Sequence, residues 1–203
     1  MMKSAFAALA LAAITMPAFA GVVINEGFEN VAGLAGSGWL FVSKSAPAGA
    51  TPGWFQGNSS IFSAQSGGQD SYAAANYNNS TPGGSVASYL LTPLFDASQG
   101  ADISFYLRSA GEGYTDRIAY GVVGGGALKL VSPVPDNGWT QYTAHIDPTK
   151  GGTRFLFEYL GNADTLNYVG LDSVVVNVPE PASIALLCGG LLGLGAVRRR
   201  ARR

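Results

Sequence analysis

Apolar and polar residues alternate over short stretches in the middle of the chain. In 103–107, isoleucine, phenylalanine and leucine occupy every second position, and in 155–159 two phenylalanines and a tyrosine do the same. A period of two residues is typical of a β-strand that buries one face. No window of about 11 residues between the two ends of the chain has a helical period. We therefore expect a domain built from strands.

Turn residues separate these strands at short, regular intervals. The sequence predicts strands at 22–29, 71–77, 86–92, 101–108, 116–123, 127–132, 139–146, 154–160 and 168–177. Residues 78–84 read as a turn, and three glycines at 124–126 predict a hairpin. This spacing is typical of an all-β sandwich, which we place at residues 21–177. A disordered stalk is the alternative, and the regular aromatic and branched residues after Val86 argue against it.

The N-terminus has the three parts of a secretory signal peptide. Lys3 supplies a positive charge, residues 5–16 are apolar, and Ala18 and Ala20 flank a small-x-small cleavage site. We therefore predict a signal peptide at 1–20, cleavage by signal peptidase, and a mature chain that begins at Gly21. The alternative is an N-terminal membrane anchor, for which the apolar run is short.

The C-terminus predicts a membrane-spanning helix. Residues 182–197 carry no charge and would span about 24 Å as a helix, and five arginines follow in 198–203. Basic residues after an apolar run stay in the cytoplasm, so the domain should lie outside the inner membrane.

The approach to this helix carries a short motif, Val178-Pro179-Glu180-Pro181. Motif, apolar helix and arginine cluster, in this order over 178–203, resemble a PEP-CTERM sorting signal. The resemblance implies that an exosortase, a membrane protease-transpeptidase, removes the helix near the motif. The domain would then reach the cell surface or an extracellular polysaccharide matrix. A simple anchor that is never processed is the alternative.

Charge and cysteine content exclude some functions for the predicted domain. Residues 21–178 hold 12 acidic and 6 basic side chains, a net charge of −6. Such an acidic domain argues against nucleic acid as a partner. Cys188, the only cysteine of the chain, lies in the apolar tail, so the domain relies on its core and not on a disulfide.

Several short segments of the predicted domain together resemble the choice-of-anchor J domain, which is related to cleaved-adhesin and MAM-like jelly rolls. The segments are Glu26-Gly27-Phe28-Glu29, Gly38-Trp39, 88–93, 103–106 and 170–174. The resemblance implies a jelly-roll β-sandwich. Two positions depart from the pattern, because Tyr89 stands where a tryptophan is usual and the closing acidic pair is reduced to Asp172-Ser173.

Three carboxylates form a candidate metal site. Glu26 and Glu29 lie on the opening strand and Asp172 on the closing strand, and these two strands are commonly neighbours in a jelly roll. Asp172 shares its parity with Val174 and Val176, so we expect it to face the core, where a carboxylate needs a partner. Related jelly rolls often hold a structural Ca²⁺ there, and Ca²⁺ takes such oxygens. The alternatives are an aspartate bonded to backbone amides and one that faces solvent.

Large aromatic residues could stack on sugars or fill the core. The candidates are Trp39, Trp54, Tyr72, Tyr77, Tyr114 and Trp139. Most large aromatics are core residues. Trp54, in a Thr-Pro-Gly-Trp-Phe loop, is the best candidate for an exposed ligand-binding residue.

Catalytic motifs are scarce in this sequence. His145 is the only histidine, and no nucleophile elbow, zinc motif or phosphate loop is present. We therefore predict a non-enzymatic exported protein with a role in adhesion or in the polysaccharide layer. The alternatives are a structural protein without a specific ligand and a hydrolase of extracellular polymers.

Overall fold

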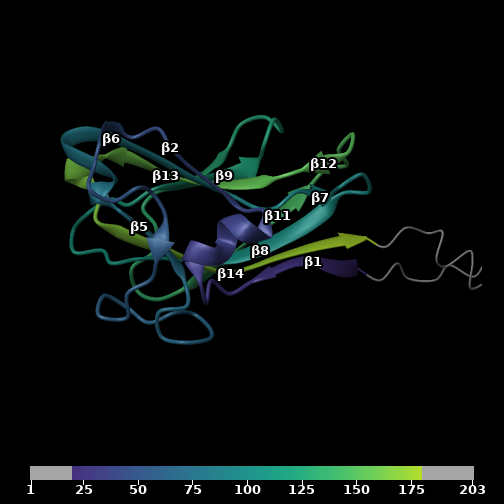
Figure 1. Cartoon of the computed structure of the whole chain (residues 1–203), viewed down its shortest axis with the longest axis horizontal. Coiled ribbons are helices and arrows are strands. Elements are labelled where there is room, and N and C mark those ends of the chain that lie inside the picture. The colour runs from purple at the N-terminus through teal and green to yellow at the C-terminus, as the bar shows by residue number, and fades with distance from the viewer. Residues whose placement is uncertain (1–19, 180–203) are drawn as a thin grey trace, which may run out of the picture. The chain divides into compact units, whose positions relative to one another are not determined.

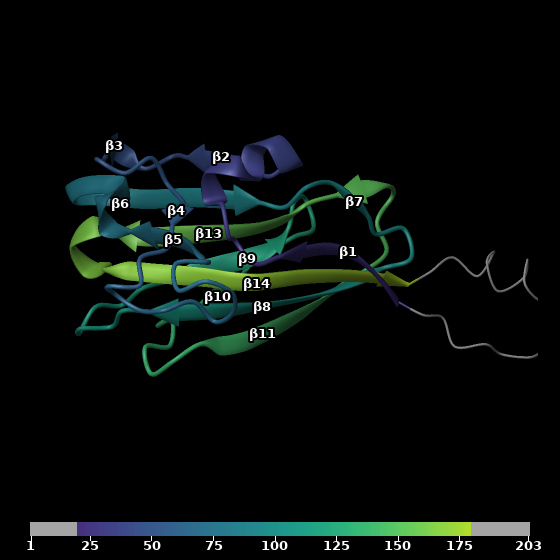
Figure 2. The same ribbon diagram turned by 60° about the horizontal axis from the view of Figure 1, so that its bottom comes forward.

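Two antiparallel sheets face each other in the computed structural model, which describes residues 20–179 (Figures 1 and 2). This confirms the all-β sandwich. The predicted signal peptide up to Phe19, and the predicted motif and helix from Glu180 onward, lie outside the described residues. Within the described residues, no helix is long and apolar enough to cross a membrane.

The first sheet has the order β11-β8-β14-β5-β4, and β1 also pairs with β14. Its strands are β1 (Ala20–Glu26), β4 (Phe55–Gln56), β5 (Ala73–Asn76), β8 (Ala101–Ser109), β11 (Thr140–Ile146) and β14 (Tyr168–Pro179). The opening and closing strands are therefore neighbours, as expected.

The second sheet has the order β10-β9-β13-β6-β2, and β3 also pairs with β6. Its strands are β2 (Leu40–Ser43), β3 (Ala46–Ala48), β6 (Ser80–Leu91), β9 (Ile118–Val122), β10 (Lys129–Val131) and β13 (Phe155–Asn162). A small ribbon of β7 (Phe95–Asp96) and β12 (Gly152–Thr153) completes the strands. Three 3-10 helices connect them, η1 (Val31–Ser37), η2 (Tyr77–Asn79) and η3 (Ala163–Thr165).

Aromatic rings from both sheets fill the space between them. The Phe105 ring of β8 lies 4.9 Å from the Phe157 ring of β13 and 4.9 Å from the Tyr120 ring of β9, both in edge-to-face geometry. Phe105 and Phe157 are fully buried. The inward faces that the alternation predicts for β8 and β13 are thus confirmed.

The N-terminal strand lies beside the strand that enters the sorting motif (Figure 1). Gly21 pairs with Val178, and Ala20 pairs with Pro179. On the other side of β14, the ladder with β8 ends where Asn177 pairs with Asp102. Within residues 20–179, Val178 and Pro179 therefore have strand partners only on β1, and the two predicted processing positions lie side by side.

Two local predictions have different outcomes. The hairpin at the three glycines is confirmed, because β9 and β10 pair across it. The turn at 78–84 is wrong from Ser80 onward, since β6 already begins there. Pairing with β3, in which Ala48 is opposite Ser80, overrides the turn-forming residues.

The aromatic core makes a quantitative prediction about stability. We expect Phe105→Ala to lower the free energy of unfolding by about 3–5 kcal/mol, because it leaves a cavity among packed rings. Ser104→Ala, on the outward face of the same strand, should change it by about 0.5 kcal/mol or less. Urea denaturation of both variants tests this, and equal losses would contradict the assignment of the two faces.

Candidate functional site

The outer face of the first sheet carries a second, smaller aromatic cluster. The Phe62 ring lies 5.1 Å from Tyr72, 5.5 Å from Tyr168 and 5.5 Å from Trp139. These rings cover Gly170 of β14, where a Cβ atom would lie 2.7 Å from the Trp139 ring. The missing side chain therefore lets the loop that carries Phe62 pack directly on the sheet.

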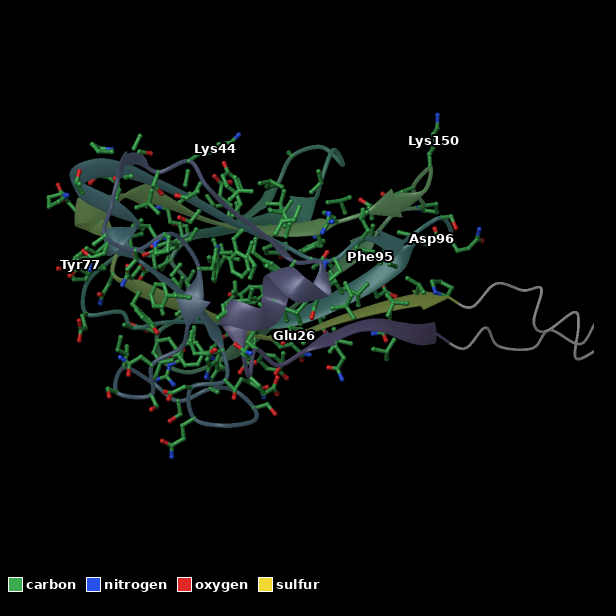
Figure 3. All side chains as sticks on the ribbon, viewed as in Figure 1. Glu26, Lys44, Tyr77, Phe95, Asp96 and Lys150 are labelled. Carbon is green, nitrogen blue, oxygen red and sulfur yellow. The ribbon has the colours of Figure 1, made fainter. Side chains whose placement is uncertain are left out.

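A pocket of about 390 Å³ opens beside this loop. Its lining is formed by Ser60, Ile61, Asn76, Tyr77, Asn78, Ala110, Glu112, Asn167 and Tyr168. Figure 3 shows Tyr77 at the end of the sandwich opposite Phe95 and Asp96. The pocket combines aromatic and apolar walls with amide, hydroxyl and carboxylate groups.

Tyr77 leaves much of its ring in solvent, although its backbone is well anchored. The Tyr77 side chain is 44% exposed. Its backbone N–H donates to the Asn167 carbonyl at 3.0 Å. The Asn76 side chain caps η2 by accepting from the Asn78 N–H at 3.1 Å. The fold thus presents an aromatic surface from a fixed backbone.

Glu112, another lining residue of the pocket, has an unusual backbone conformation. Gly111, Glu112 and Gly113 have φ angles of 71°, 58° and 84°. Left-handed conformations are unfavourable for a residue with a side chain, and such strain concentrates at functional sites. The Glu112 Oε2 atom accepts a hydrogen bond from Asn167 Nδ2 at 3.1 Å. The strained turn therefore joins a carboxylate and an amide at the rim of the pocket.

A buried carboxylate, that of Asp116, holds the backbone of the pocket residue Asn167 in place. Asp116 is 1% exposed, and its Oδ1 atom accepts from the Tyr159 hydroxyl at 2.6 Å and from the Asn167 N–H at 2.8 Å. Its Oδ2 atom is buried without a hydrogen-bond partner among the described residues. Burial raises the pKa of Asp116 above its ordinary value. The position of Asn167 is therefore set from the interior.

The expectation that Trp54 is exposed is wrong, so it does not offer a free ring to a ligand. Trp54 is only 5% exposed and belongs to the core between the sheets. Its indole N–H donates to the Ser88 carbonyl of β6 at 3.1 Å. The next residue, Phe55, begins β4, whose pairing with β5 draws the ring inward.

The expected orientation of Asp172 is also wrong. Asp172 pairs with Tyr106, which lies on the outward face of β8, and the register then shifts before Val175. Ser173 has a φ angle of 51° at this bulge. A bulge changes the parity of a strand, so Asp172 faces the outer loop whereas Val174 faces the core.

The Asp172 carboxylate is satisfied by the backbone. Its Oδ2 atom accepts from the N–H groups of Gln65 at 2.8 Å and Ser66 at 3.2 Å, and its Oδ1 atom accepts from the Ser173 N–H. Burial nevertheless raises the pKa of Asp172 to about 6, against the opposite effect of these hydrogen bonds. Of the three alternatives, the structure shows an aspartate bonded to backbone amides.

The other two candidate calcium ligands lie close together. Glu26 Oε1 accepts from the Phe28 N–H at 2.7 Å. Burial raises the pKa of Glu26, and the charge of Glu29 raises it further. Across residues 20–179, no three acidic, histidine or cysteine side chains are placed to hold one metal ion. Asp172 does not fit the proposed donor set, and calcium binding by Glu26 and Glu29 stays a prediction.

His145 lies on the surface with a partner that sequence reasoning did not find. Its Nδ1 atom is 2.8 Å from Asp102 Oδ1, and the two side chains are 64% and 74% exposed. The pair forms because His145 of β11 is directly opposite Asp102 of β8.

Sequence reasoning named Tyr77 among the candidate sugar-stacking aromatics but missed the pocket that it forms with Glu112 and Asn167. These residues come from three separate connections, so no periodic pattern joins them. A further local signal was the glutamate between two glycines, which is typical of a backbone in an uncommon conformation.

Comparison with known proteins supports the motif and the fold. Residues 177–200 match the family described as the PEP-CTERM protein-sorting motif. The sorting motif expected at this end is therefore found, beginning within β14. A search of curated proteins finds no match.

Solved structures with a similar fold include cleaved adhesin domains of Lys-gingipain from Porphyromonas gingivalis W83. The K1 domain is 18% identical, with a TM-score of 0.56 over 76% of this chain and 97% of that domain. The K3 domain is 17% identical, with a TM-score of 0.53 over 77% of this chain and 99% of that domain. At this level of identity the likeness concerns the fold alone.

The paired glutamates generate a test with metal ions. If Glu26 and Glu29 bind Ca²⁺, saturating calcium should raise the melting temperature by several degrees, because a ligand at about 100 times its Kd adds about 2.7 kcal/mol. EDTA should reverse the shift, and Glu29→Gln should remove it. Glu112→Gln is the control and should keep the calcium response. An unchanged melting temperature after chelation and calcium re-addition would contradict calcium binding.

Proposed function

We propose that this chain is an exported surface or matrix protein whose sandwich binds extracellular polysaccharide weakly through the Tyr77 pocket. The observation that carries the proposal is the composition of that pocket, an exposed aromatic ring beside a carboxylate and several amides. The sorting motif at 177–200 supports an extracellular location.

The chemistry of the pocket suits a sugar ring. A pyranose presents C–H groups on its faces and hydroxyls around its edge. The faces can stack on the Tyr77 ring, while the hydroxyls can donate to Glu112 and exchange hydrogen bonds with Asn76, Asn78 and Asn167. Such a small site forms few contacts with a polymer, so we expect modest affinity for each sugar and tighter binding only through repetition along the polymer.

Sorting completes the proposed function. Signal peptidase would release the N-terminus at Gly21, and an exosortase-type protease would act near Pro179 after a transient stay in the inner membrane. We assign the sandwich to the choice-of-anchor J group on the segments that resemble it. A structural protein without a ligand is the alternative, and the strained presentation of Glu112 favours the binding role.

A hydrolase is the less favoured alternative for this pocket. Glycoside hydrolysis ordinarily uses two carboxyl groups on either side of the scissile bond. Glu112 is the only carboxylate in the lining of the Tyr77 pocket. We therefore propose binding without turnover.

Binding at the pocket is tested by removing the exposed ring. We expect Tyr77→Ala to weaken binding of the chain's polysaccharide ligand about five- to twelvefold, as loss of an aromatic contact of about 1–1.5 kcal/mol would do. Tyr77→Phe keeps the ring and should bind nearly as well as wild type. Leu130→Ala, at an exposed position of the second sheet, is the control. A polysaccharide array identifies the ligand, and equal binding by all variants would contradict the proposed site.

Processing is tested by the intact mass of the protein recovered from cells and medium. We expect a species that begins at Gly21 and ends between Pro179 and Ala182, because both predicted cleavage positions border the sandwich. A species in the membrane fraction that retains Arg203 would instead identify a simple anchor.

A further inference from the structure

Arg108 is the one half-buried arginine whose side chain makes no hydrogen bond within the described part of the protein. Arg154, which is also half-buried, donates from Nη1 to the carbonyls of Gly38 at 2.7 Å and Thr92. The Arg108 Nε atom, in contrast, is buried and has no hydrogen-bond partner among residues 20–179. The single ion pair found in that range joins His145 and Asp102.

Aromatic side chains hold the Arg108 guanidinium in place. Its central carbon lies 4.6 Å from the centre of the Phe62 ring, which is the distance of a cation–π contact. Arg108 is opposite Gly170 in the β8–β14 ladder, so no neighbouring side chain of β14 separates it from the aromatic cluster. An unpaired guanidinium that is fixed against a ring is prepared for an external anion.

Trp139 supplies a second surface at the same place. Thr140 is opposite Leu107, so Trp139 lies next to Arg108 at the end of the β8–β11 ladder. The Trp139 ring is half-buried, lies 5.5 Å from Phe62, and donates its indole N–H to the Ser63 carbonyl at 2.9 Å. A fixed indole next to a fixed guanidinium can hold a sugar ring and its carboxylate together.

Arg108 and Phe62 are not lining residues of the Tyr77 pocket, but each lies close along the chain to residues that are. Ala110 lines that pocket and follows Arg108 by two residues along the chain, a step of about 7 Å in an extended backbone. Ser60 and Ile61 line the pocket, while the next residue, Phe62, lies under the Arg108 guanidinium. A polymer in the pocket can therefore place a neighbouring sugar at Arg108.

We propose that Arg108 and Trp139 form a subsite for a carboxylated sugar residue, which makes the protein selective for uronic-acid polysaccharides. The inference rests on the proposed function, because it names the ligand class of the same face. A carboxylate matches the planar fork of a guanidinium, and two parallel hydrogen bonds form where geometry allows. The net charge of −6 on residues 21–178 repels polyanions in general, so the selectivity depends on this local cation.

The experiment compares two polymers with the same sugar backbone, one with free carboxylates and one with uncharged methyl esters. Polygalacturonate and its fully methyl-esterified form are titrated into the protein as it is recovered after export, by isothermal titration calorimetry at low salt. We expect polygalacturonate to bind about tenfold tighter or more, as hydrogen bonds to a charged group provide. The preference should shrink when sodium chloride is added, because salt screens the pairing.

Variants assign the preference to one side chain. Arg108→Gln should bring the ratio of the two affinities close to one. Arg108→Lys should lower this ratio only partly, because lysine keeps the charge but lacks the planar guanidinium. Arg117→Gln, which removes an exposed arginine next to β9, should leave the ratio unchanged. Near-ultraviolet circular dichroism confirms that each variant is folded, and the salt dependence of the wild type tests the inference without any variant.

Two results would overturn the inference, and they differ in what they say of the proposed function. Equal binding of both polymers, lost in Tyr77→Ala and unaffected in Arg108→Gln, would remove the carboxylate subsite and keep polysaccharide binding. Absence of binding to these polymers and to every polysaccharide of the array would overturn both proposals.

Discussion

The last strand, β14, has partners along both sides. It pairs with β8 on one side and with β5 and β1 on the other. This arrangement joins the first strand of the domain to the last and closes the first sheet around a central strand. The aromatic core needs this closed sheet, because the β8 residues that face Phe157 are positioned by the β8–β14 ladder. The outer loop depends on it as well, since its rings rest on Gly170 of the same strand.

A bulge at Ser173 divides β14 into two parts with different roles. Before the bulge at Ser173, the outward positions Gly170 and Asp172 receive the loop that carries Phe62 and Gln65. After the bulge, β14 runs beside β1 toward the sorting motif. One strand therefore supports the candidate binding face at one end and enters the processing segment at the other. The pocket opens at the Tyr77 end of the sandwich, opposite Phe95 and Asp96 (Figure 3), and Tyr168 at the start of β14 is one of its lining residues.

Polar residues at the candidate site are organised from the inside outward. Asp116 holds the Asn167 backbone, Asn167 contacts Glu112 through its side chain, and Tyr77 is held by the Asn167 carbonyl. This chain of hydrogen bonds places the pocket groups before any ligand arrives, which lowers the entropy lost on binding. Arg108 is held differently, by contact with rings and not by a polar partner. That difference distinguishes a preformed polar pocket, which carries the Glu112 carboxylate, from a cation that is left for an anionic group.

Some of these features follow from the sequence alone. The two-residue period of 103–107 and 155–159 determined the sandwich and its inward faces, because alternation on a half-buried strand depends only on neighbouring residues. The order of motif, apolar run and arginines identified the sorting signal for the same reason. Only the tertiary structure decided where the Trp54 and Asp172 side chains lie and which residues form the Tyr77 pocket. A pairing between β4 and β5, a bulge in β14, and the meeting of three distant connections set these positions, and no local pattern encodes contacts of that kind.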